Sequence, residues 1–135
     1  MPGKGCMPQR FQVAGRVEPE TRRIVFSIRG QIDSRLLIDR YIEIYSGIDA
    51  PWTYDRVFDY RRSDGIVEHV DIARMAQWWA EHIDPACGVT RVAVIVNNPL
   101  DLLRARGVGE QFPKDDRQTF LSLDDALSWL DEGKG

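Results

Sequence analysis

Hydrophobic and polar residues alternate in two segments near the start of the chain, residues 11–17 and 23–28. Alternation with a period of two is typical of a strand that buries one face. Pro19 lies between the two segments, where its fixed φ suits a turn position. The pattern therefore predicts a β-hairpin with a loop of about four residues. The apolar positions of its two strands are Phe11, Val13, Val17, Ile24, Phe26 and Ile28.

Two longer segments, residues 33–47 and 67–83, repeat apolar residues at the i, i+3, i+4 and i+7 spacing of an amphipathic helix. Asp33 or Ser34 is expected to cap the first helix, and Gly47 to end it in the left-handed conformation. A short strand is expected between the two helices. The apolar positions are Leu37, Tyr41, Ile44 and Tyr45 in the first helix and Ile72, Met75, Ala76, Trp79 and Ile83 in the second.

The segment "RVAVIVNN", residues 91–98, contains an uninterrupted apolar run from Val92 to Val96. A strand without polar alternation has both faces covered, which is typical of the central strand of a largely parallel sheet. Asn98 is expected to cap a helix that starts with Pro99 and ends by Gly107.

The last unit, "RQTFLSLDDALSWLDE", is predicted to contain a short strand at Phe120 and Leu121, followed by a helix. Ser122 and Asp125 have the spacing of a capping box at the start of this helix. The predicted order is β-β-α-β-α-β-α-β-α. The fold class is therefore α/β, with a mixed five-stranded sheet, an N-terminal β-hairpin and about four helices.

Composition narrows the protein class. The chain has 135 residues, of which 43% are hydrophobic and 29% charged, and its net charge is −3. These values predict one domain over residues 10–132 after a disordered tail at residues 1–9. The charge argues against a nucleic-acid partner, and no apolar run approaches the roughly 18 residues of a membrane span. Cys6 and Cys87 are isolated, so we expect free thiols in a reducing cytoplasm.

The order of elements resembles the STAS superfamily, and more closely its SpoIIAA-like branch of small bacterial proteins. The resemblance spans residues 11–131 and rests on "RVFDYRR", "WWAEHI", "TRVAVIVNN" and "RQTFLSLDDALSWL". It implies an SpoIIAA-like fold and a regulatory role through a protein partner. The branch is also linked to lipid-binding folds of the CRAL-TRIO type, which implies a hydrophobic ligand as the alternative.

In STAS proteins that antagonise anti-sigma factors, a strand aspartate precedes a loop whose Asp-Ser-Ser/Thr-Gly motif is phosphorylated. Asp59 matches that aspartate in this chain. The loop that follows is shorter, and Ser63 precedes Asp64 rather than following it. We therefore predict that Ser63 is not a regulatory phosphosite.

Polar residues follow the predicted strands at the edge where open α/β sheets bind ligands. Helix N-termini at this edge would add free N–H groups and a partial positive charge, which suit a phosphate or a carboxylate. The alternative is that Ser63 or Asp64 only caps the next helix, Gly65 supplies a turn, and the arginines are solvated. The candidate ligand residues are Arg61, Arg62, Ser63, Asp64, Asn97 and Asn98.

Aromatic residues of the first two helices give a second candidate site. An exposed tryptophan beside a methionine would form a patch for a protein partner or a second copy of the chain. The alternative is that the loop "IDAPWTY" covers Trp78. The candidate interface residues are Tyr41, Tyr45, Met75 and Trp78.

The sequence contains no visible catalytic site. His69 and His82 fall on different faces of one predicted helix, and no ligand cluster with metal-binding spacing accompanies them. We therefore expect a non-enzymatic module, without a cofactor or a metal, that acts through a protein partner or self-association. The alternative function is binding of a small anionic or lipid-like ligand at the carboxyl ends of the parallel strands.

Overall fold

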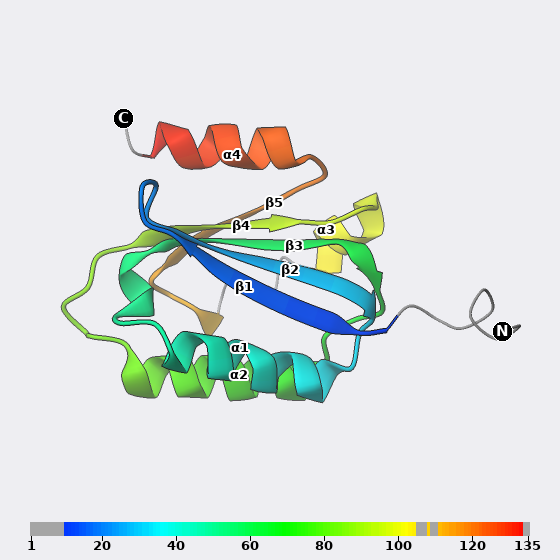
Figure 1. Ribbon diagram of the computed structural model, residues 1–135, viewed down its shortest axis with the longest axis horizontal. Coiled ribbons are helices and arrows are strands. Elements are labelled where there is room, and N and C mark those ends of the chain that lie inside the picture. The colour runs from blue at the N-terminus through cyan, green and yellow to red at the C-terminus, as the bar shows by residue number, and fades with distance from the viewer. Residues whose placement is uncertain (1–9, 105–107, 109–110, 134–135) are drawn as a thin grey trace, which may run out of the picture.

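The computed structural model describes residues 10–104, 108 and 111–133 (Figure 1). Within these residues, five strands form one mixed sheet that is accompanied by four α-helices and a short 3-10 helix at Pro51–Thr53. The α/β class, the hairpin and the five-stranded sheet are confirmed. The strands are β1 Gln12–Glu18, β2 Arg23–Gln31, β3 Asp55–Asp64, β4 Thr90–Ile95 and β5 Asp115–Phe120. The helices are α1 Ser34–Ser46, α2 His69–His82, α3 Pro99–Arg104 and α4 Leu123–Glu132.

The strands lie in the order β1-β2-β3-β4-β5, with β1 antiparallel to β2 and the other pairs parallel. β4 therefore lies between β3 and β5, as its apolar run predicts. The parallel strands end at the edge from which α1, α2 and α3 begin (Figure 1). The predicted disordered tail at residues 1–9 and the predicted helix end at Gly107 lie outside the described residues.

β3 is longer than the sequence indicates. Ser63 and Asp64 pair with Gly30 and Gln31 of β2, after a register shift between Ser27 and Arg29. The hypothesis that Ser63 or Asp64 caps the next helix is therefore wrong, because α2 begins at His69.

The turn after β3 is made by Gly65. Its φ of 103° lies in a region that side chains disfavour, as expected for a glycine turn.

Two smaller expectations are also wrong. β5 begins at Asp115 rather than at Phe120, because its polar residues hide an edge strand from a hydrophobic pattern. Gly47 follows α1 with a φ of −90°, so this helix ends without a left-handed residue. Asp33, Asn98 and Ser122 act as caps as predicted, each accepting a backbone N–H.

The sheet buries a separate core on each face. α1 and α2 cover one face, and α4 covers the other (Figure 1). At the centre of the first core, the rings of Phe26 and Phe58 stack with their centroids 4.8 Å apart. Tyr41 and Tyr45 of α1 meet the Phe26 ring edge-on, at 5.1 and 5.3 Å. The smaller core against α4 contains Val57, Ala93, Ile95, Ala126 and Leu130.

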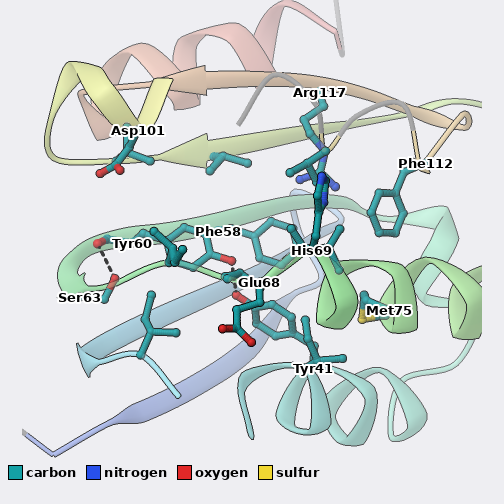
Figure 2. Close-up of a pocket in the computed structure, with 18 of the residues that line it drawn as sticks. Tyr41, Phe58, Tyr60, Ser63, Glu68, His69, Met75, Asp101, Phe112 and Arg117 are labelled. Carbon is teal, nitrogen blue, oxygen red and sulfur yellow. Dashed lines mark hydrogen bonds between the residues drawn. The ribbon is translucent and has the colours of Figure 1, made fainter. Parts of the chain in front are cut away.

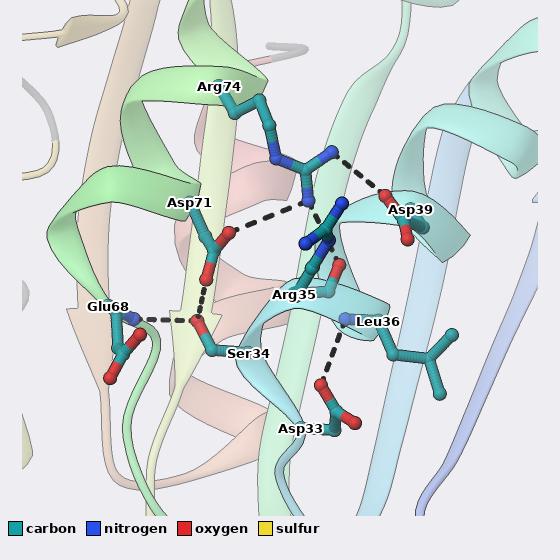
Figure 3. A network of polar contacts seen from close by, with 8 residues as sticks. All are labelled: Asp33, Ser34, Arg35, Leu36, Asp39, Glu68, Asp71 and Arg74. Atoms are coloured by element: carbon teal, nitrogen blue, oxygen red, sulfur yellow. Dashed lines mark hydrogen bonds and ion pairs between the residues drawn. The ribbon is translucent and has the colours of Figure 1, made fainter.

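A polar network joins the starts of α1 and α2 (Figure 3). The Ser34 hydroxyl donates to the buried Asp71 carboxylate at 2.7 Å and accepts the Glu68 N–H at 2.8 Å. It thereby satisfies a backbone donor at the uncapped start of α2. Arg74 reaches across to Asp39 of α1 at 2.8 Å. A buried carboxylate that loses its partner costs about 1–3 kcal/mol or more, so this network holds α2 beside α1.

Candidate functional site

A cavity of about 740 Å³ lies between the sheet and the helices α1 and α2 (Figure 2). Pockets for small ligands span about 300–1,000 Å³ and are mostly apolar. Among the lining residues that the structure describes, those exposed to solvent all lie between Gly65 and Val70. This segment connects β3 to α2 and forms the start of that helix. The cavity therefore opens at the carboxyl edge of the sheet. Arg117 and Phe112 lie at the opposite end from Ser63 and Asp101 (Figure 2).

Strand register arranges the cavity floor in rows. Arg56, Val92 and Arg117 are direct neighbours across β3, β4 and β5. Two residues further along each strand, Phe58 lies beside Val94. Because side chains two residues apart share a face, the floor changes from a charged row to apolar rows toward the opening.

The charged end of the cavity contains two arginines and one carboxylate. The Arg56 Nη2 atom lies 2.5 Å from Asp115 Oδ1, and the Arg117 Nη2 atom lies 3.2 Å from Asp115 Oδ2. The side chains of Arg56, Asp115 and Arg117 are 2%, 1% and 14% exposed. We call these three residues the arginine cluster. Two guanidinium groups share one carboxylate, so the cluster has one excess positive charge.

Donors remain free in the arginine cluster. The buried Nε–H groups of Arg56 and Arg117 have no hydrogen-bond partner among the residues that the structure describes. The Arg56 Nη2 group also donates to Thr90 Oγ1 at 3.2 Å. The cluster is therefore positive and not fully hydrogen-bonded. Buried polar groups of proteins are normally paired, so two unpaired Nε–H donors in residues that line the cavity make the arginine cluster a candidate binding site.

Aromatic rings cover the arginine cluster. The guanidinium of Arg56 lies 4.3 Å from the centroid of the Trp79 ring, and that of Arg117 lies 5.1 Å from the centroid of the Phe112 ring. Burial lowers the pKa of Arg56, but Tyr45 and Asp115 outweigh burial and raise its pKa above the ordinary arginine value. The positive charge of Arg56 is therefore kept at neutral pH.

A pair of tyrosines lines the cavity nearer its opening. The hydroxyl oxygens of Tyr41 and Tyr60 lie 2.6 Å apart and share a hydrogen bond (Figure 2). Burial raises the pKa of Tyr41, and it raises the pKa of Tyr60 to about 12. Both hydroxyls are therefore protonated at neutral pH. Their mutual bond uses one proton, and the other remains available to a further acceptor.

The predicted ligand residues are mostly engaged with one another. Asp59 holds the Arg61 guanidinium through two hydrogen bonds of 2.9 and 2.8 Å. The Asn97 amide donates to the Arg61 carbonyl, and Asn98 caps α3. Arg62 and Asp64 are exposed.

Among these candidates, Ser63 lines the cavity and the other five residues do not. The buried Ser63 hydroxyl donates to the Tyr60 carbonyl at 2.8 Å, which supports the prediction that it is not a phosphosite.

The predicted interface residues do not form an exposed patch. Tyr41, Tyr45 and Met75 are buried, because both helices turn these side chains toward the sheet, where they line the cavity. Trp78 is half-buried and stacks on His82, with ring centroids 4.2 Å apart. The loop residue Trp52 packs against Trp79, with ring centroids 6.5 Å apart.

The sequence interpretation missed the arginine cluster. Arg56 alternates with Phe58 and Tyr60 on β3, so its position on the buried face was readable from the strand period. Asp115 and Arg117 left no such signal, because β5 was not recognised as a strand over these residues.

Other kinds of site find no support in the described part of the chain. Residues 10–104, 108 and 111–133 contain no group of three or more His, Cys, Asp or Glu side chains that could hold a metal ion. His69 and His82 are exposed. No helix of the described segments has the length and apolarity needed to cross a membrane.

Comparisons with known proteins agree with this architecture. No protein-family model matches the chain, and no curated protein matches it. A solved structure of an uncharacterized DUF3478-family protein with a SpoIIAA-like fold, from Shewanella loihica PV-4, is 19% identical with a TM-score of 0.60. It covers 92% of this chain and 95% of its own.

A second solved structure, an anti-sigma factor antagonist from Mycobacterium paratuberculosis, is 18% identical with a TM-score of 0.53. The match covers 90% of this chain and 95% of that protein. Both similarities extend over nearly the whole length of each protein, and they confirm the predicted fold. The chain therefore has a SpoIIAA-like α/β fold.

Proposed function

We propose that this chain is a non-enzymatic binding module that holds a small amphipathic anion in the cavity beneath α1 and α2. The observation that carries the proposal is the arginine cluster, with its excess positive charge and free Nε–H groups at one end of an apolar cavity. This function corresponds to the ligand-binding alternative from the sequence. The site lies deeper than the polar residues expected at the strand ends.

The physical reason is charge balance. A buried charge without a counter-ion costs several kcal/mol, and an anion that accepts hydrogen bonds from the arginines would remove that cost. The apolar walls would bind the rest of the ligand, at roughly 25 cal/mol per Å² of buried apolar surface. An anion with an apolar body satisfies both ends of the cavity.

Calorimetric titration with decanoate tests this function. We expect binding of one decanoate per chain, and we expect Arg117→Met to weaken it about 10- to 150-fold. This range corresponds to the 1.5–3 kcal/mol of a hydrogen bond to a charged group. The substitution keeps an apolar stem of similar length, and Asp115 keeps Arg56 as its partner.

Arg61→Met is the matched control. It also removes an arginine of the sheet, but Arg61 is exposed and does not line the cavity. The affinity of the Arg61→Met variant for decanoate should equal that of the unchanged chain. Equal losses in the two variants would mean that general electrostatic attraction, rather than the cavity, binds decanoate.

Contact with a protein partner is a second candidate function. It is favoured by three exposed apolar side chains near the carboxyl edge of the sheet, Ile66, Val70 and Leu100. The structural similarity to an anti-sigma factor antagonist also supports a partner-binding role. Sedimentation velocity of the chain at increasing concentration tests the self-association form of this function.

A further inference from the structure

We infer that the ligand is a monoanion, a carboxylate with an extended apolar chain, whose head group lies at Arg117 and whose chain points toward the carboxyl edge. This inference rests on the proposed function and names the ligand class of the same cavity. Three features of the structure support it: the charge of the arginine cluster, the free donor of Arg117, and the order of polar and apolar rows along the floor.

The charge of the arginine cluster selects a single negative charge. Arg56 and Arg117 contribute two positive charges and Asp115 one negative charge, so a carboxylate brings the buried sum to zero. A phosphate monoester carries about −1.5 to −2 at neutral pH and would leave negative charge uncompensated. An ammonium head group would add to the excess positive charge of the arginine cluster.

Arg117 has the better access to a head group. Its side chain retains some exposure, whereas Arg56 is fully enclosed and is also bonded to Thr90 and stacked on Trp79. The planar guanidinium fork matches the two oxygens of a carboxylate. Arg117 is therefore the direct contact, and Arg56 contributes charge from behind it.

The opening of the cavity suits the apolar chain rather than the head group. The exposed side chains of Ile66 and Val70 line the cavity there. An apolar chain that reaches them buries apolar surface on both sides. The positive arginine cluster at one end and these apolar side chains at the other therefore orient the ligand with its head group inward.

The dimensions accommodate an extended chain. The lining follows β3 from Arg56 to Ser63, a span of roughly 23 Å at the rise of a strand. A ten-carbon chain extends about 11 Å, taking about 1.2 Å per bond from extended backbone geometry. Such a chain would pass Phe58 and Val94 and end inside the cavity, before the opening.

A head-group series tests the inference by calorimetry. The probes are decanoate, decanol, decyl phosphate and decyltrimethylammonium, which share the chain and differ in charge. We expect decanoate to bind at least tenfold tighter than decanol, decyl phosphate to bind weaker than decanoate, and the cation to show no binding. Arg117→Met should remove the difference between decanoate and decanol, while Arg61→Met should keep it.

Arg117→Lys is a control for loss of the fold, because the substitution keeps the positive charge and removes the planar guanidinium fork. It should keep decanoate tighter than decanol, by a smaller factor. If decanol binds as tightly as decanoate, or decyl phosphate more tightly, the monoanion inference is overturned and cavity binding stands. If no probe binds, the proposed function itself fails.

Discussion

Replacing Asp115 by asparagine is expected to lower the free energy of unfolding by about 3–5 kcal/mol, the usual cost of leaving a buried charge without its partner. Asp115 accepts from both Arg56 and Arg117, and its side chain is almost fully enclosed. Asparagine keeps the shape of the side chain and removes its charge, so two positive charges would face each other in the core. Urea denaturation measures the change.

Asp116→Asn is the matched control on the same strand. Asp116 pairs with Arg91 at 3.5 Å and is half-exposed, and exposed ion pairs contribute about 0–1 kcal/mol. The substitution should therefore change stability little. Similar losses at the two positions would contradict the description of Asp115 as the counter-ion of a buried cluster.

Replacing Trp79 by alanine is expected to cost about 3–5 kcal/mol, as for other large-to-small substitutions in a core. Trp79 is buried, contacts Tyr45 and Trp52, and stacks on the Arg56 guanidinium. Its neighbour Trp78 is half-buried, so Trp78→Ala should cost less. Thermal or urea unfolding of the two variants makes the comparison.

The same two variants address association. If Trp78 belonged to a packed interface, Trp78→Ala would shift a dimer toward the monomer in sedimentation while stability changed little. The structure instead stacks Trp78 between Tyr45 and His82 within the chain. We therefore expect Trp78→Ala to leave the sedimentation of the chain unchanged. If Trp78→Ala lowered the stability more than Trp79→Ala, the assignment of Trp79 to the core would be wrong.

The fold could be predicted from the sequence wherever periodicity and capping agreed. The alternation of Ile24, Phe26 and Ile28 identified β2, and the apolar run from Val92 to Val96 identified β4 as a central strand. β5 was recognised only at its end, because its first residues are polar. Those residues belong to an edge strand whose charges pair with Arg56 and Arg91 across the sheet.

The candidate site could not be predicted from the sequence, because polar residues gave a misleading signal. The polar residues near the strand ends were predicted to bind a ligand, but Arg61 and Asn98 are held by local contacts to Asp59 and to the start of α3. Arg56 and Arg117 lie far apart in sequence, and only the parallel register places them in one row. A single sequence contains no direct signal for that pairing.

An NMR spectrum of the arginine Nε–H groups, recorded during titration with decanoate, tests directly whether a carboxylate head group binds at the arginine cluster. The buried Nε–H groups of Arg56 and Arg117 have no partner among the described residues, so a head group at the arginine cluster must change their surroundings. We predict a saturable shift of the Arg117 signal, with a smaller shift at Arg56 and none at Arg61. Binding of decanoate that leaves the Arg117 signal in place, or that moves the Arg61 signal instead, would contradict it.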